Sequence, residues 1–144
     1  MNTVPPAATW GPWEAELPAC VWRLPRHSRS VGRARARFRS QAGRWDLAEE
    51  TAETAVLLLS ELVTNAVRHG HVRGRHIEVR CVLAPTVLRV DVSDAGRGVP
   101  VLRQAAAEDE SGRGLTLVAA LATTWGVLPR RHGIGKTVWC EISR

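Results

Sequence analysis

Tyrosine is absent from this chain of 144 residues, and phenylalanine, methionine and lysine each occur once. No apolar run reaches the roughly 18 residues that a membrane-spanning helix needs, and the N-terminal residues lack the basic start and apolar stretch of a secretory signal peptide. The three cysteines are far apart and form no CxxC pair, which argues against a disulfide framework or a zinc site. We therefore expect a cytoplasmic protein that has reduced thiols and no membrane partner.

Lysine is so scarce that arginine supplies nineteen of the twenty basic residues, and the net charge is +6. A basic chain raises nucleic-acid binding as a hypothesis. However, the chain has no tyrosine and one phenylalanine, its six tryptophans are scattered, and no recognition motif is present, so direct nucleic-acid binding is not expected. Eight arginines and no acid lie between residues 23 and 44. This stretch predicts either a solvated helix face or a surface for an acidic protein partner.

The length and the composition fit one globular domain. Residues 1–17 are rich in proline and have no periodicity, which predicts a flexible N-terminal extension, and residues 18–144 predict the domain itself. Within the domain, hydrophobic periodicity predicts a strand, two helices, a hairpin, a buried helix and two last strands. Their ranges are 19–24, 28–43, 46–69, 76–83 with 87–93, 115–121, and 126–130 with 136–143.

This order of elements predicts an α/β (α+β) two-layer sandwich with a mixed, mostly antiparallel sheet. Val31 begins the predicted apolar stripe of the first helix. Asp46 is the predicted N-cap of the second helix, and Glu49 three residues later completes a capping box.

The second predicted helix carries Glu61, Asn65 and His69 one turn apart, so their side chains share one helix face beside the apolar stripe. An amide oxygen suits Mg²⁺, which also takes oxygens from phosphate and water. A carboxylate one turn earlier can accept a proton from an attacking hydroxyl. By itself, the pattern E-x-x-x-N also fits an ordinary exposed polar face.

Two glycine-bearing motifs follow along the chain. Asp94, at the end of a predicted strand, precedes Gly96 and Gly98, so a carboxylate that can accept a hydrogen bond from an exocyclic amine lies beside a loop that can approach a ligand closely. Gly112 and Gly114 precede a predicted helix, whose unpaired N–H groups and dipole favour phosphate. Each motif is common in loops, so neither assigns a function by itself.

The segment from Gly133 to Thr137, G-I-G-K-T, is similar to the end of a P-loop, but the pattern fails. Arg130 stands where the P-loop requires its first glycine. The residues from Thr137 onwards alternate as a strand does, whereas a P-loop continues into a helix. We therefore expect a last strand at this position.

In this order, the motifs E-x-x-x-N, D-x-G-x-G, G-x-G-L and G-K-T on a last strand resemble the Bergerat-fold (GHKL) superfamily of ATPases and kinases. That superfamily includes gyrase, heat-shock chaperones, mismatch-repair ATPases and histidine kinases. The resemblance covers about residues 19–143. The short chain, the wording SELVTNAVRHG and the ending GKTVWCEI are similar to the anti-sigma-factor serine/threonine kinases. The resemblance also implies that helices cover one face of the sheet.

The resemblance implies a role for each matching residue. Asn65 would hold the Mg²⁺ that bridges the phosphates of ATP, and Glu61 would be the catalytic base. Asp94 would bind the amino group of adenine, and Thr137 would help through a water molecule. The other residues that would contact the nucleotide are Arg68, His69, Gly96, Gly98, Gly112, Arg113, Gly114 and Leu115.

The resemblance further implies a kinase that phosphorylates an anti-anti-sigma (STAS-type) protein on serine or threonine and holds a sigma factor, with a homodimer as a further arrangement. The alternative is an ATP-binding switch that sequesters a partner without phosphorylating it. No lysine between Gly98 and Gly112 can meet the γ-phosphate, so Arg97, Arg103 or Arg113 would have to neutralise it. A histidine kinase is not expected, because no dimerisation helix with a phosphoacceptor histidine is evident.

Overall fold

A computed structural model describes residues 15–69, 76–94, 118–129 and 135–144 of the chain. In chain order, these residues form β1 (Ala19–Leu24), α1 (Arg29–Arg44), α2 (Glu49–His69), β2 (Ile77–Leu83), β3 (Val87–Asp94), β4 (Thr124–Pro129) and β5 (Lys136–Ser143). Neither α1 nor α2 is both long and apolar enough to span a bilayer. The division of the chain at residue 17 stays a prediction.

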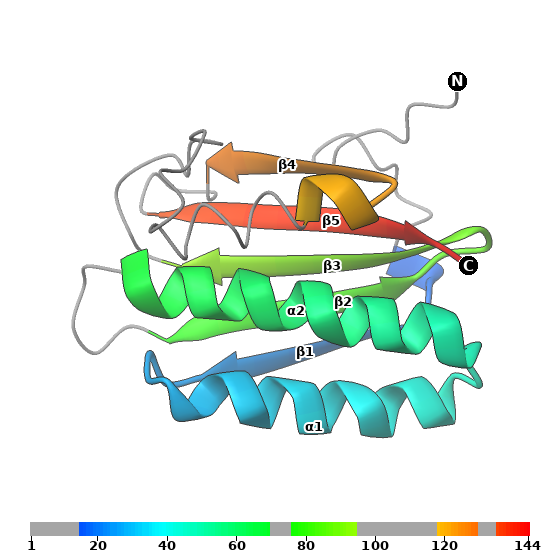
Figure 1. Cartoon of the computed structure of the whole chain (residues 1–144), viewed down its shortest axis with the longest axis horizontal. Coiled ribbons are helices and arrows are strands. Elements are labelled where there is room, and N and C mark those ends of the chain that lie inside the picture. Colours follow the sequence, from blue (N-terminus) through cyan, green and yellow to red (C-terminus); the bar gives the residue numbers. More distant parts are fainter. Residues whose placement is uncertain (1–14, 70–75, 95–117, 130–134) are drawn as a thin grey trace.

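The five described strands form one sheet in the order β1-β2-β3-β5-β4, and each neighbouring pair is antiparallel. The predicted hairpin is confirmed as β2 and β3, with Leu83 opposite Leu88. The predicted first strand is confirmed as β1, at one edge of the sheet. Figure 1 shows α1 and α2 side by side on one face of this sheet. The two-layer α+β class is therefore confirmed, with a sheet that is antiparallel throughout its described strands.

The core lies between the sheet and the two helices. Strand side chains alternate between the two faces of a sheet, and the helix-facing ones pack with the apolar stripes of α1 and α2 in one cluster, which includes Leu88, Val90, Val92, Phe38, Leu59 and Leu62. Val31, which the helical spacing places in the core, is only partly buried. Ser30 is buried instead. Its hydroxyl tolerates burial because it donates a hydrogen bond to the Pro25 carbonyl.

The prediction that Asp46 caps the start of α2 is wrong, because Asp46 belongs to the end of α1. Its φ is 50°, in the left-handed region, and its N–H donates to the Gly43 carbonyl at 3.2 Å. The Leu47 N–H donates to the Ala42 carbonyl at 3.1 Å. These two bonds form a Schellman ending, whose left-handed position usually holds glycine but also admits aspartate. The helix α2 begins only at Glu49.

The predicted buried helix at 115–121 is helical in its described part, as expected, but the prediction that it is buried is wrong there. Residues 118–121 are helical, but only Val118 among them is buried, and Leu121 is 43% exposed.

The strand β4 begins at Thr124, two residues before the predicted start at 126. A glycine is needed at position 126, because a Cβ there would lie 2.8 Å from the Trp139 ring on the neighbouring strand.

Candidate functional site

One end of the molecule gathers residues from three of the sequence motifs. The helix α2 and the strand β3 end there and β5 begins there, as the left side of Figure 1 shows. The register places Asp94, the last residue of β3, opposite Lys136, the first residue of β5. Glu61 and Asn65 lie in the last turns of α2, which packs against β3 and β5. The fold therefore brings the first, second and fourth motifs to one end of the sheet.

Asn65 is a buried polar residue of α2 whose amide nitrogen lacks a hydrogen bond to any described residue. Only 6% of its surface is exposed, yet its Nδ2 has no hydrogen-bond partner among the described residues. Because buried polar groups are nearly always hydrogen bonded, an unpartnered amide fits a position that receives a ligand. A rotation of the terminal side-chain bond exchanges the positions of Nδ2 and Oδ1. The Asn65 oxygen can therefore face a ligand at the position that Nδ2 faces now.

Glu61 lies one helical turn before Asn65 and is partly buried. An amide oxygen beside a carboxylate, with phosphate and water completing the set, is the kind of oxygen coordination that Mg²⁺ accepts. The residues present therefore fit the predicted magnesium ion. Partial burial also leaves the Glu61 carboxylate accessible to an incoming hydroxyl group.

Asp94 is buried at the end of β3, with 2% of its surface exposed. The Nζ atom of Lys136 lies 3.7 Å from Asp94 Oδ1. An ionised carboxylate is costly to bury, and a nearby ammonium group offsets part of that cost. The motifs do not reveal this pair, because it depends on the register between two strands. Asp94 ends β3 and Lys136 begins β5, so the pair could be predicted only with the knowledge that these two strands are antiparallel neighbours.

Thr137 lies next to this pair in the register but presents its hydroxyl to the other sheet face. Its Oγ1 lies 2.7 Å from the Oγ of Ser93, its cross-strand neighbour. Consecutive strand residues point to opposite faces, so this hydroxyl pair lies on the face opposite to the Asp94 carboxylate. A water-mediated contact between Thr137 and a base held by Asp94 therefore stays a prediction.

The remaining candidates divide into two groups. Arg68 is exposed and His69 is partly buried in the last turn of α2, where basic residues also stabilise the helix through its dipole. The others lie outside the described residues, so their roles stay predictions: Gly96, Gly98, Gly112, Arg113, Gly114 and Leu115.

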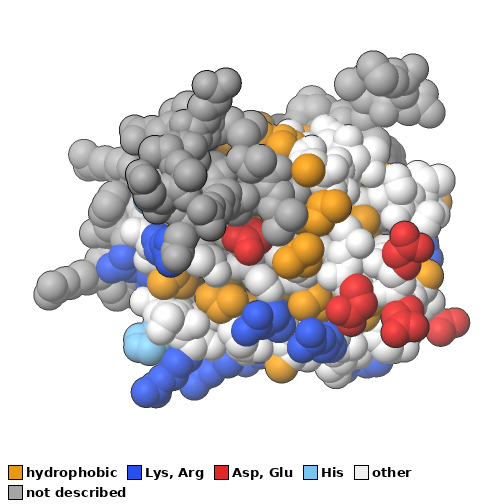
Figure 2. Space-filling model, in the orientation of Figure 1, with side chains coloured by type: hydrophobic (Ala, Val, Ile, Leu, Met, Phe, Trp, Pro, Cys, Tyr) orange, Lys and Arg blue, Asp and Glu red, His pale blue; other side chains and the backbone are white. Residues whose placement is uncertain are grey.

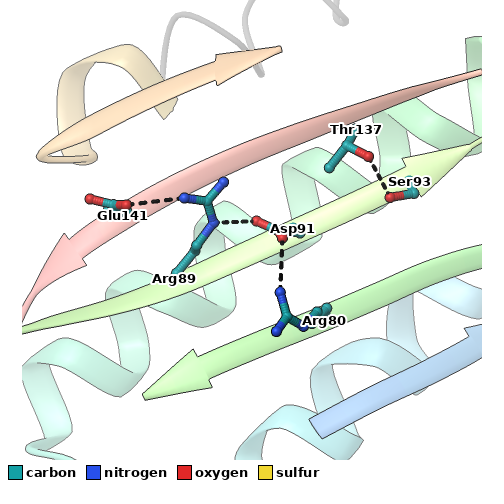
Figure 3. A network of polar contacts seen from close by, with 6 residues as sticks. All are labelled: Arg80, Arg89, Asp91, Ser93, Thr137 and Glu141. Carbon is teal, nitrogen blue, oxygen red and sulfur yellow. Dashed lines mark hydrogen bonds and ion pairs between the residues drawn. The ribbon is translucent and has the colours of Figure 1, made fainter. Parts of the chain in front are cut away.

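A second polar cluster, which the motifs did not indicate, lies on the sheet face away from the helices (Figure 3). Arg89 is fully buried there, with its Nε 2.7 Å from Asp91 Oδ1 and its Nη1 3.2 Å from Glu141 Oε1. The guanidinium also lies 4.4 Å from the centre of the Trp139 ring, within reach of a cation–π interaction. The sequence places Arg89 and Glu141 far apart, and only the pairing of β3 with β5 makes them neighbours.

The pKa of Glu141 reflects the charges around it in this cluster. Burial raises the pKa of Glu141 to about 7; the Arg89 guanidinium opposes this rise, and the Asp91 carboxylate adds to it. Because the cluster lies on the opposite face from Asn65 and Asp94, we interpret it as part of the framework that supports β3 and β5, separate from the candidate site.

Comparisons with known proteins connect this geometry to a family. Residues 24–141 match the family described as histidine kinase-like ATPase domain. An uncharacterized protein of Streptomyces coelicolor is 38% identical over 86 residues, which cover 58% of this chain and 79% of that protein. The histidine kinase domain of a blue-light activated histidine kinase from Erythrobacter litoralis is 26% identical, with a TM-score of 0.49. That match covers 80% of this chain but only 59% of the solved chain.

Proposed function

Because this chain belongs to the histidine kinase-like ATPase domain family, we propose that it is an ATP-dependent protein kinase of a bacterial partner-switching pathway. Its substrate is an anti-anti-sigma (STAS-type) protein, which it phosphorylates on serine or threonine. Its second partner is a sigma factor, which it holds when ATP is bound. Family membership supports ATP binding, while the wording of the motifs supports the substrate and the sigma partner.

The observation that carries this proposal is the buried Asn65 amide, one turn from Glu61, whose Nδ2 has no partner in the described part of the chain. In the proposed mechanism, Asn65 would hold a magnesium ion, and that ion would neutralise charge on the ATP phosphates. Glu61 takes the proton from the partner's serine hydroxyl as the serine oxygen attacks the γ-phosphorus of ATP. The bond between the γ-phosphorus and the bridging oxygen breaks, and ADP leaves. Asp94 accepts a hydrogen bond from the amino group of adenine and thereby orients the nucleotide.

A second function, a switch that binds ATP and sequesters a partner without transferring phosphate, is favoured by one observation. The single lysine of the chain is 6% exposed and lies against Asp94. In this arrangement it does not reach outwards towards a γ-phosphate, so an arginine has to supply the charge that phosphoryl transfer requires. Transfer of radiolabel from ATP to the partner protein separates the two functions.

The Asp94→Asn substitution tests the nucleotide site. An ionised carboxylate that accepts a hydrogen bond contributes about 1.5–3 kcal/mol, so we expect ATP affinity to fall by about 10- to 100-fold. Inosine triphosphate, which lacks the amino group, serves as the matched ligand. Wild type should prefer ATP over inosine triphosphate, and the variant should lose most of that preference, as measured by calorimetric titration.

The control for this experiment is Asp46→Asn, which removes one exposed carboxylate in the turn after α1. It should leave both affinities unchanged. If Asp94→Asn lowers the affinities for ATP and for inosine triphosphate equally, Asp94 does not bind the amino group of adenine. If it changes neither affinity, the proposed nucleotide site is wrong.

A basic surface on α1 supports a protein partner of acidic character. Arg29, Arg33, Arg37 and Arg44 follow one line along α1 and are exposed. Figure 2 shows Lys and Arg side chains along the lower edge of the molecule, over α1. None of these four arginines makes an ion pair with any described residue. Like charges one turn apart destabilise a helix by a few tenths of a kcal/mol, and an acidic partner would remove this repulsion.

Charge reversal tests this surface. The double variant Arg33→Glu/Arg37→Glu should capture the partner at least about tenfold less well, because like charges then face each other. The matched control is Arg35→Glu/Arg39→Glu, which makes the same charge change on another side of the same helix. Capture with ATP or with ADP, read by mass spectrometry, identifies the partner and any phosphate that it gains.

Equal losses in the two double variants would mean that net charge, and not this surface, controls capture. A gel shift with random DNA that persists at physiological salt and disappears in Arg33→Glu/Arg37→Glu would assign the surface to nucleic acid instead.

A further inference from the structure

Two of the three cysteines lie directly opposite each other in the sheet. Cys20 on β1 pairs with Cys81 on β2 in the antiparallel register, and both are free thiols. The two side chains are close enough that each thiol shifts the pKa of the other. Cys81 belongs to the buried core and Cys20 packs against it, so both thiols point to the helix-covered face. The nucleotide mechanism uses neither residue.

The geometry of such a pair suits a disulfide bond. Directly opposed residues of antiparallel strands have Cα atoms about 4.5–5.5 Å apart. Disulfides join residues whose Cα atoms are about 4.4–6.8 Å apart. The register therefore places the Cα atoms of Cys20 and Cys81 in the range of separations that a disulfide joins.

The two thiols differ in the way that a reactive pair requires. The hydrogen bond from Cys81 lowers the pKa of Cys20, and the Arg44 guanidinium lowers it further, while partial burial opposes both effects. The hydrogen bond with Cys20 and complete burial raise the pKa of Cys81. Cys20 is also partly exposed, whereas Cys81 is fully buried. Because the thiolate is the nucleophile, Cys20 is the thiol that meets an oxidant from solvent.

We infer that Cys20 and Cys81 form a redox modification site, in which a peroxide converts the two thiols into a cross-strand disulfide between β1 and β2. The Cys20 thiolate attacks one peroxide oxygen, the O–O bond breaks, and with one proton taken up the products are a sulfenic acid and water. The Cys81 sulfur then attacks Cys20 Sγ, the S–O bond breaks, and a second water leaves with the Cys81 proton. Each sulfur loses one electron, and the peroxide gains both.

The consequence is a covalent link between the edge strand and the rest of the sheet. Among the described strands β1 pairs with β2 alone, and α1 begins five residues after β1 ends. The bond closes the loop from residue 20 to residue 81, which contains α1 and α2. Closing a long loop restricts the unfolded chain, so the oxidised protein should have the higher thermal midpoint.

The test treats the reduced full-length chain with hydrogen peroxide and counts free thiols. We expect three thiols to fall to one, with a mass lower by two hydrogen atoms and a 20–81 crosslinked peptide after proteolysis. Dithiothreitol should restore all three thiols. The matched control is Cys140→Ser, since burial raises the pKa of Cys140 to about 12 and keeps it inert; this variant should still form the bond.

Cys20→Ser removes the partly exposed partner and should abolish the crosslink, leaving two buried thiols that peroxide does not touch. Three free thiols after treatment of wild type would overturn the inference. A crosslink between Cys20 residues of two molecules, or oxygen addition without a 20–81 peptide, would also overturn it.

Discussion

The Glu61→Gln variant is expected to bind ATP as tightly as wild type and to phosphorylate its partner protein about 10²–10⁴-fold more slowly. Glutamine keeps the size of the side chain and its place one turn before Asn65, but it cannot take the proton of a serine hydroxyl. In the proposed site Asp94 and Asn65 hold the nucleotide, so its binding should survive. The measurement is transfer of radiolabelled γ-phosphate to the captured partner, beside a calorimetric titration with ATP.

Glu53→Gln is the matched control, because Glu53 is an exposed carboxylate two turns earlier on the same helix. It should transfer phosphate at the wild-type rate. An unchanged rate in Glu61→Gln would remove Glu61 from the mechanism. If wild type binds ATP and its partner but transfers no phosphate at all, the non-catalytic switch replaces the kinase.

The strands and helices were predictable where one local pattern determines them. Apolar and polar residues alternate in 76–83 and 87–93, as they do in a strand whose two faces meet different surroundings. The structure pairs these segments as β2 and β3. The same alternation did not predict that all eight residues of β3 are buried, the polar ones included. Asp46 was misassigned because an aspartate between two helices suits two positions. It can be the N-cap of the second helix or the left-handed residue that ends the first, and the structure shows the latter.

The candidate site was predictable in part, for a related reason. The helical spacing alone placed Glu61 and Asn65 on one face, and the fold brings them to the same end as Asp94. The contact of Lys136 with Asp94 was not predicted, because it depends on the register of β3 against β5. Spacing along the chain describes neighbours within an element, whereas pairing between distant strands is decided by the whole sheet.

Arg89→Ala is expected to destabilise the protein by about 3–5 kcal/mol, which is a large part of the roughly 5–15 kcal/mol that holds a typical domain together. The guanidinium is fully buried between Asp91 and Glu141. Its removal leaves two buried carboxylates without their closest cation, and it also takes away the contact with the Trp139 ring. Urea unfolding measures the loss. Arg80→Ala is the control, because Arg80 is 35% exposed and lies 4.0 Å from Asp91; it should cost less than about 1 kcal/mol.

The loss in Arg89→Ala should also depend on pH. In the folded protein the pKa of Glu141 is about 7, above the ordinary value of 4.5. Protonation of Glu141 therefore favours the folded state below pH 4.5, and this contribution is lost as the pH rises through about 7. Without Arg89 that pKa rises further, so the decline with pH extends to higher pH. The variant should lose more stability at pH 8.5 than at pH 5.5, because at the lower pH Glu141 is neutral and does not need the Arg89 cation. Equal losses at both pH values, or a loss in Arg80→Ala as large as in Arg89→Ala, would show that Arg89 does not hold this pair of carboxylates together.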